Sequence, residues 1–214
     1  MKESDLVIRP YRADDLEGVR AMSDRLSSAS LYQRFFVGTP RLPDSYLRSL
    51  STVDHRGRVV LLAVSAAGVH AIAEYIRDAA DPATSELAFL VTDPWQRRGL
   101  SRPLLMRLAT IAASAGVTRF RADVLPENSA ARAAIRRYHP GSTFTRLPDS
   151  LYRYEFPPLD HRDHEDPRGR EAAPQGRTPG PRPFWPKTTD PLTSGRWSRG
   201  GQLFLKGLKV RPAR

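Results

Sequence analysis

A basic, glycine-containing turn is the part of this sequence best suited to hold a phosphate group. Residues 91–105 have the pattern of a strand end, the turn Gln96 to Ser101 and the start of a helix. Free backbone N–H groups and the positive end of the dipole at a helix N-terminus attract anions. Gly99 has no side chain, so a phosphate oxygen can approach the backbone there. Arg97, Arg98 and Arg102 add charge that suits a pyrophosphate or a 3′-phosphate.

The turn differs from the common nucleotide-binding motifs. It has no Gly-Lys-Ser/Thr sequence, as a P-loop would, and it lacks the three spaced glycines of a dinucleotide fingerprint. Taken alone, it also fits a plain strand-to-helix connection with a solvated basic surface. The elements around the turn therefore decide between the two interpretations.

Regular elements surround the turn throughout residues 1–159. Gly116 is placed to end the helix that follows the turn, because glycine readily adopts the left-handed conformation of a helix C-terminus. Asp14 or Asp15 can cap the first helix, which is expected to end near Leu26. The apolar pattern predicts strands at 6–9, 58–65, 69–77, 85–92, 118–124, 142–145 and 151–156, and further helices at 30–36, 43–50, 100–115 and 128–138.

In this context the turn resembles the GNAT motif Gln/Arg-x-x-Gly-x-Gly/Ala, and the order of elements resembles the GNAT fold. The segment Leu26–Phe36 resembles an early helical segment of bacterial protein lysine acetyltransferases of the Pat type. Asp123–Ala131 resembles the splayed strand and following helix of the family. The resemblance covers about residues 6–156. It implies an α+β, three-layer fold in which helices cover both faces of a mixed, mostly antiparallel central sheet.

The resemblance also implies an acetyl-CoA site between the fourth and fifth strands, which part in this family to admit the thioester. Pantetheine would pair like a strand with the end of the fourth strand, and the pyrophosphate would lie over the turn. Ser101 replaces the Gly or Ala of the motif, which makes the fit tighter. The implied contacts are Leu90, Val91, Thr92, Gln96, Arg97, Arg98, Gly99, Leu100, Ser101, Arg102 and Asn128.

Acyl transfer to an amine needs a base, because an amine is mostly protonated at neutral pH. Glu86 resembles the strand glutamate that serves as the base in Pat-type enzymes, and a surface carboxylate at a strand start is the alternative. Glu74, on the preceding predicted strand, is the reserve candidate, although a lone strand carboxylate is expected on a solvated face. Many GNAT enzymes place an acidic Tyr where this chain has Ile135. Tyr138 is thus a candidate acid or a packing residue, and water can protonate the thiolate instead.

The composition excludes several other kinds of site. The sequence has no cysteine, which excludes disulfides, thiolate metal sites and a cysteine nucleophile. Its five histidines are scattered without ligand spacing, so no metal is expected. No apolar run approaches the roughly 18–20 residues that span a bilayer, and the charged N-terminus lacks the apolar core of a signal peptide. We therefore expect a soluble, cytoplasmic protein that does not bind membranes.

The composition changes near Pro157, which divides the chain into a GNAT-like domain at 1–159 and a tail at 160–214. The tail is rich in Pro, Gly and Arg and carries +6 of the net charge of +11. Such a segment is predicted to be disordered, because it cannot bury enough apolar surface to offset its ordering entropy.

The leading functional hypothesis is an acetyl-CoA-dependent N-acetyltransferase whose acceptor is a protein lysine or a small amine. A catalytically weak module that senses acyl-CoA is a second possibility. A binder of nucleic acid or another anionic polymer through the basic tail is a third, but the tail's sparse aromatic residues argue against it. The sequence leaves both a monomer and a homodimer open.

Overall fold

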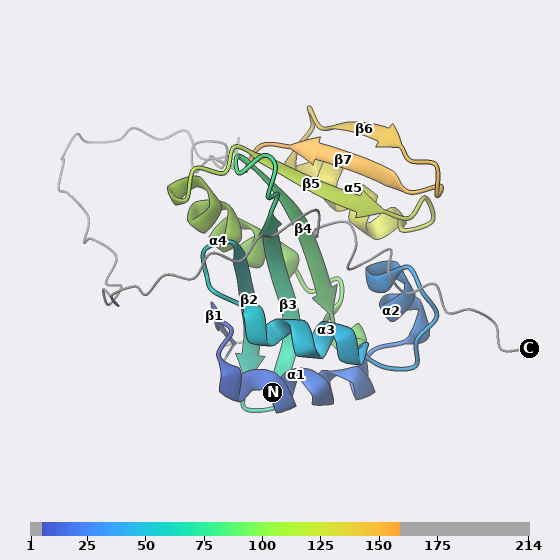
Figure 1. The fold of residues 1–214 in the computed structure, drawn as a ribbon. Helices are drawn as coiled ribbons and strands as arrows, with labels where there is room; N and C mark the ends of the chain where they lie inside the picture. Colours follow the sequence, from blue (N-terminus) through green and yellow to red (C-terminus); the bar gives the residue numbers. More distant parts are fainter. Residues whose placement is uncertain (1–5, 159–214) are drawn as a thin grey trace, which may run out of the picture.

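A seven-stranded sheet in the order β1-β2-β3-β4-β5-β7-β6 forms the centre of the protein (Figure 1). The computed structural model describes residues 6–158. The predicted tail lies outside them, and so its disorder and the domain boundary remain predictions. The strands are β1 (Val7–Pro10), β2 (Arg58–Ser65), β3 (Gly68–Arg77), β4 (Thr84–Val91), β5 (Arg119–Val124), β6 (Thr143–Arg146) and β7 (Tyr152–Phe156). The α-helices are α1 (Leu16–Ala21), α2 (Ser28–Phe35), α3 (Asp44–Ser49), α4 (Ser101–Ser114) and α5 (Ser129–Tyr138).

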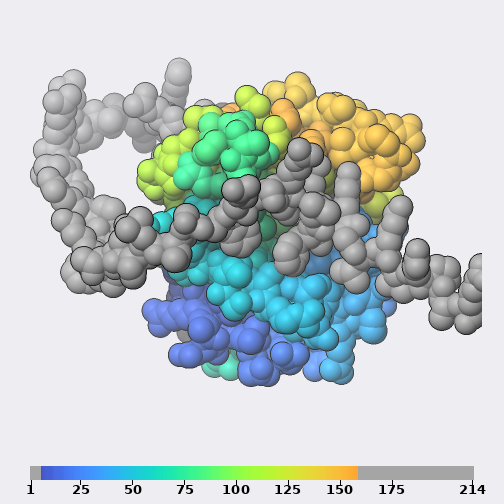
Figure 2. Space-filling model, in the orientation of Figure 1, coloured from blue at the N-terminus to red at the C-terminus, as the bar shows by residue number. Residues whose placement is uncertain are grey.

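Helices cover both faces of the sheet, as the sequence predicted. Figure 2 shows the N-terminal helices (blue) on one side of the domain and β6 and β7 (orange) at the opposite end. One core lies between α1–α3 and the sheet, and includes Val60, Leu62 and Leu90. A second core lies between α4 and the other face, and includes Leu61, Leu104 and Leu108. The uninterrupted apolar run of β2 reflects this burial on both faces.

All neighbouring strands are antiparallel except β4 and β5. These two parallel strands pair only from Thr84 to Glu86, opposite residues 119–121. β5 remains paired with β7 as far as Val124, and β4 remains paired with β3 as far as Val91. The two strands therefore separate immediately after Glu86, while each keeps its other neighbour.

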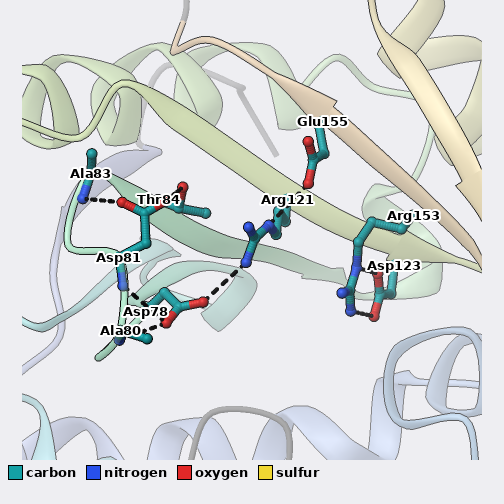
Figure 3. A network of polar contacts seen from close by, with 9 residues as sticks. All are labelled: Asp78, Ala80, Asp81, Ala83, Thr84, Arg121, Asp123, Arg153 and Glu155. Atoms are coloured by element: carbon teal, nitrogen blue, oxygen red, sulfur yellow. Dashed lines mark hydrogen bonds and ion pairs between the residues drawn. The ribbon is translucent and has the colours of Figure 1, made fainter.

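The closed end of this fork is held by a polar network (Figure 3). Arg121 on β5 bonds Asp78, at the end of β3, and Glu155 on β7, with N–O distances of 3.0 Å in both cases. Nearby, the Asp81 carboxylate accepts a 2.6 Å bond from the Thr84 hydroxyl. These contacts join the β3–β4 turn to β5 and β7, so the strands are fixed at one end and open at the other.

Most predicted elements are confirmed to within one residue at each end. α4 ends in a Schellman motif, in which Gly116 has a φ of 78° and the Val117 N–H bonds the Ala112 carbonyl at 2.9 Å. Asp15 occupies the predicted N-cap position of α1, but its side chain makes no capping bond there, because its carboxylate accepts bonds from Arg9 at 2.6 Å and from the Arg12 N–H at 2.8 Å.

The first and second helices also differ from the prediction. Two short 3₁₀ segments, Ala13–Asp15 and Met22–Arg25, flank α1, so the expected single helix is broken into three pieces. α2 begins two residues early because the Ser27 hydroxyl accepts a 3.2 Å bond from the Ser30 N–H and caps it. Between residues 6 and 158, no helix combines the length and apolar character needed to cross a membrane.

Candidate functional site

A cavity of about 180 Å³ lies where β4 and β5 part. Its lining comes from both faces of the sheet, with Arg34 and Phe36 near α2 on one side and Ser101 and Asn128 near α4 and α5 on the other. This volume far exceeds the roughly 10–15 Å³ that one water needs. The cavity therefore has room for the reactive end of a thioester and for an amine approaching from the opposite face.

Glu86 lies at the fork and lines this cavity. It is the last residue of β4 that pairs with β5. Because side chains alternate along a strand, Glu86 shares the sheet face of Leu90, which packs in the core beneath α1–α3. Burial raises the pKa of the Glu86 carboxyl, and the nearby Asp123 carboxylate raises it further, while Arg34 and Arg153 oppose this shift. A half-buried carboxylate with a raised pKa is suited to accept a proton near neutral pH.

Glu74 is not the solvated side chain that the sequence suggested. Its side chain is 3% exposed and forms ion pairs with Arg34 and Arg58. Burial alone would raise the pKa of Glu74, but these two guanidinium groups hold it below its usual value. Glu74 is therefore a buried anion with two fixed partners, and it is a poor candidate for a proton-accepting base. The prediction failed because Arg34 and Arg58 lie far from Glu74 in the sequence.

On the other side of Glu86, Asp123 on β5 lines the cavity and binds Arg153 on β7. The two Arg153–Asp123 bonds measure 2.8 and 2.7 Å, and Figure 3 shows the two side chains facing one another across the strands. Asp123 was not predicted as a site residue, although it begins the segment that resembles the splayed strand. Asp123 and Arg153 add one negative and one positive charge beside the candidate base.

The turn Gln96–Ser101, which the sequence predicts to bind phosphate, has the unusual backbone geometry that its glycine allows. Gly99 has a φ of 81°, and Arg97 also has a positive φ, at 60°. A Cβ atom at Gly99 would meet no protein atom within 4 Å, so the space in front of the backbone is open. Ser101 begins α4 and lines the cavity, while the Arg98 guanidinium lies over the Trp95 ring. The turn thus offers an open helix N-terminus with exposed arginines, as a pyrophosphate requires.

The side chain of Gln96 connects the turn to its surroundings. Its amide lies 2.8 Å from the Ser30 hydroxyl, 3.0 Å from Asp93 and 3.2 Å from the Val91 carbonyl. Asp93 in turn accepts bonds from the Ser27 N–H and the Ser30 hydroxyl. The first residue of the motif therefore joins the turn to the start of α2.

The cavity lining includes residues 86–89 of β4, whereas the expected pantetheine contacts Leu90, Val91 and Thr92 lie beyond it. Leu90 is buried in the core beneath α1–α3. The Thr92 N–H donates to the His70 carbonyl at 2.9 Å, so a cofactor that pairs with Thr92 would have to use its carbonyl.

The helix α5 and its N-cap residue complete the site. The Asn128 side chain caps α5 by accepting a 3.0 Å bond from the Ala131 N–H, and it also lines the cavity. Tyr138 lines the same cavity as Glu86, and so does Ile135, which stands where the resemblance implied a tyrosine. The candidate acid and the candidate base thus share one cavity. Within residues 6–158, no three metal-ligating side chains are grouped so that they could hold a metal.

The chain is similar to known acetyltransferases. Acetyltransferase Pat of Mycolicibacterium smegmatis is 33% identical over 158 residues, which make up 72% of this chain and 46% of that protein. The chain thus spans about half the length of this relative. No model of a protein family matches the sequence.

Solved structures agree with this similarity. The GNAT domain of S. lividans PAT is 34% identical, superposes with a TM-score of 0.64, and the match covers 70% of this chain and 89% of that domain. A cAMP-binding acyltransferase from Mycobacterium smegmatis is 26% identical with a TM-score of 0.51, over 76% of this chain and 46% of the other.

Proposed function

Because this chain belongs to the GNAT family of N-acetyltransferases, we propose that it transfers an acetyl group from acetyl-CoA to a primary amine, with Glu86 as the general base. The observation that carries this proposal is the position of Glu86. It lies where β4 and β5 part, in a cavity lined from both faces of the sheet. A thioester and an amine can therefore meet beside a carboxylate with a raised pKa.

The proposed reaction begins with acetyl-CoA bound on the α4–α5 side of the sheet. The turn Gln96–Ser101 and the N-terminus of α4 hold the pyrophosphate, with charge from Arg97, Arg98 and Arg102. Asn128 lies beside the path of the pantetheine arm. This arrangement places the thioester at the opening between the strands.

The amine enters from the side covered by α2. Glu86 accepts a proton from the amine, and the neutral nitrogen attacks the thioester carbonyl carbon. A backbone N–H at the parted strand stabilises the oxyanion that forms. The carbon–sulfur bond then breaks and the attacking nitrogen releases its second proton to water, which gives the neutral amide. The departing thiolate takes a proton from Tyr138 or from water and leaves as the CoA thiol.

The acceptor class is a protein lysine or a small amine. Support for a protein lysine comes from the segment Leu26–Phe36, which resembles an early helical segment of Pat-type protein lysine acetyltransferases. This same segment borders the cavity through Gln33, Arg34 and Phe36.

The test is acetyl-CoA turnover measured against a panel of small amines and lysine-bearing proteins. We expect CoA release that depends on the acceptor. Tight acetyl-CoA binding without acceptor-dependent release would instead identify an acyl-CoA sensor and would contradict the proposal.

A further inference from the structure

Arg34 belongs both to the cavity and to the buried interior. It lies on α2 and lines the cavity together with Glu86, yet its side chain is only 11% exposed. The sequence analysis did not select it, because one arginine on an amphipathic helix usually lies on a solvated face. A buried guanidinium at a reaction cavity needs a fixed partner, and Arg34 has one in Glu74.

The partner of Arg34 is itself held firmly. The Nε and Nη2 atoms of Arg58 donate to Glu74 at 3.0 and 2.7 Å. The Nη1 atom of Arg58 donates to the backbone carbonyl of Ser49 at 2.7 Å and to its hydroxyl at 2.9 Å. Glu74 therefore has a second guanidinium partner that is anchored at the end of α3, which leaves Glu74 little freedom to release Arg34.

Aromatic rings on two helices enclose the Arg34 guanidinium. Its central carbon lies 5.0 Å from the centre of the Phe35 ring and 5.5 Å from that of Tyr46. Both distances fall within the range of cation–π attraction. Arg34 is thus fixed by β3, α2 and α3 together, and its charge occupies a defined place at the cavity wall.

Glu74 and Glu86 lie on the same face of the sheet. Glu74 is opposite Ala88, and Glu86 is opposite Ile76, which makes the two carboxylates diagonal neighbours on adjacent strands. Four charged groups act on Glu86 from the surrounding elements: Arg34 from α2, Glu74 from β3, Asp123 from β5 and Arg153 from β7. Glu86 is therefore flanked by two ion pairs, Arg34–Glu74 on one side and Arg153–Asp123 on the other.

We propose that Arg34 is a positioning residue of the acetyl-transfer site, whose guanidinium, fixed by Glu74, presents a permanent positive charge to Glu86 and holds the end of α2 as the wall on the acceptor side. This inference rests on the proposed role of Glu86 as base. A fixed cation favours the carboxylate form of a neighbouring acid, which is the form that accepts a proton from the amine. Asp123 acts on Glu86 in the opposite direction.

The opposite signs of these two effects provide the test. The variants are Arg34→Gln, Arg34→Lys and Asp123→Asn, and the quantity measured is the acidic limb of the pH profile of kcat/KM. In Arg34→Gln we expect this limb to move to higher pH, because a positive charge is lost. Arg34→Lys restores the charge and should return the limb towards its wild-type position. Asp123→Asn should move it to lower pH.

A readout independent of turnover accompanies the pH profile. The side-chain carboxyl carbons of glutamate are labelled with ¹³C, and the Glu86 resonance is identified by its absence in Glu86→Gln. In each of the three variants, the midpoint of the NMR titration of Glu86 should move in the same direction as the acidic limb of the pH profile. Lack of a shift in Arg34→Gln, or a shift in the same direction as in Asp123→Asn, would overturn the inference. Loss of activity without a titration shift would show a purely structural role and would overturn it as well.

Two outcomes keep this inference separate from the proposed function. If the wild-type protein shows no acceptor-dependent turnover, the proposed function fails, but the NMR titration still tests Arg34. If Arg34→Gln does not fold, Arg34→Met replaces it, because it removes the charge with an apolar side chain of similar length and leaves Glu74 paired with Arg58. The Glu86 resonance should again titrate at higher pH in this variant. An unchanged or lower titration would contradict the proposal.

Discussion

Replacing Glu74 with Gln should destabilise the protein markedly, although the side chain keeps nearly the same size. The side chains of Glu74, Arg34 and Arg58 are 3%, 11% and 10% exposed, so the two guanidinium groups would remain buried after their shared anion is lost. Breaking a buried ion pair by removing one partner costs roughly 3–5 kcal/mol. The Gln side chain retains an acceptor oxygen and Arg58 keeps its bonds to Ser49. We therefore expect a cost near the lower limit, about 3 kcal/mol.

This cost can be measured by urea unfolding at pH 7, followed by circular dichroism. In a thermal unfolding experiment on a domain of this size, the same cost of about 3 kcal/mol corresponds to a fall in Tm of roughly 6–12 °C. The matched control is Asp24→Asn, which removes an ion pair with Arg41 at 3.4 Å whose side chains are 66% and 74% exposed. Such an exposed pair contributes at most about 1 kcal/mol.

The pH dependence gives the prediction a second part. The pKa of Glu74 in the folded protein lies below its ordinary value. Its contribution is therefore fully present above the unfolded pKa of about 4.3 and is lost as the pH falls through the folded pKa. The difference between wild type and Glu74→Gln should shrink in acid. If Glu74→Gln unfolds within about 0.5 kcal/mol of wild type at pH 7, the interpretation of Glu74 as a paired, buried anion is refuted.

Three further substitutions test the positions of other residues. Burial, and to a smaller extent the charge of Arg25, lower the pKa of His70 in the folded protein. The contribution of His70 to stability is therefore present above its unfolded pKa of about 6.5 and is lost as the pH falls through the folded pKa. His70→Gln should flatten this part of the stability–pH curve, and an unchanged slope would contradict the assignment. Gly99→Ala should cost about 1 kcal/mol in unfolding free energy, because Gly99 has a φ of 81°, and calorimetry should show weaker binding of acetyl-CoA; normal binding would argue against the turn as its site. Ser27→Ala removes the cap of α2 and should also cost about 1 kcal/mol in urea unfolding, whereas Ser51→Ala, at an exposed position, should have little effect.

The sequence predicted the strands well because their signal is local. β2 is a continuous apolar run between turn residues, and its predicted and observed bounds coincide. The end of α4 was equally clear, because Gly116 is suited to the left-handed conformation that the helix end requires. The parting of β4 and β5 came from the family resemblance, since no local pattern states how far two parallel strands stay paired.

The charged residues around Glu86 could not be predicted from local sequence patterns. Arg34, Arg58 and Glu74 meet only after three elements have packed, and each alone has the pattern of a surface residue. A weak signal existed, because Glu74 lies within the strongly apolar β3 strand, where a carboxylate must have a partner. The motif residue Gln96 is a similar case, since its contacts with Ser30 and Asp93 depend on the packing of α2 against the turn.

The most direct test of the central claim compares wild type with Glu86→Gln in two assays, acetyl-CoA binding by calorimetry and acceptor-dependent CoA release. Glu86 lies at the fork, and the turn Gln96–Ser101, the proposed phosphate site, lies beyond the end of β4, so the substitution should leave acetyl-CoA binding intact. We expect turnover to fall by about 10²–10⁴-fold, the usual contribution of a general base. Turnover at the wild-type rate in Glu86→Gln, with unchanged acetyl-CoA binding, would contradict the assignment of Glu86 as the base.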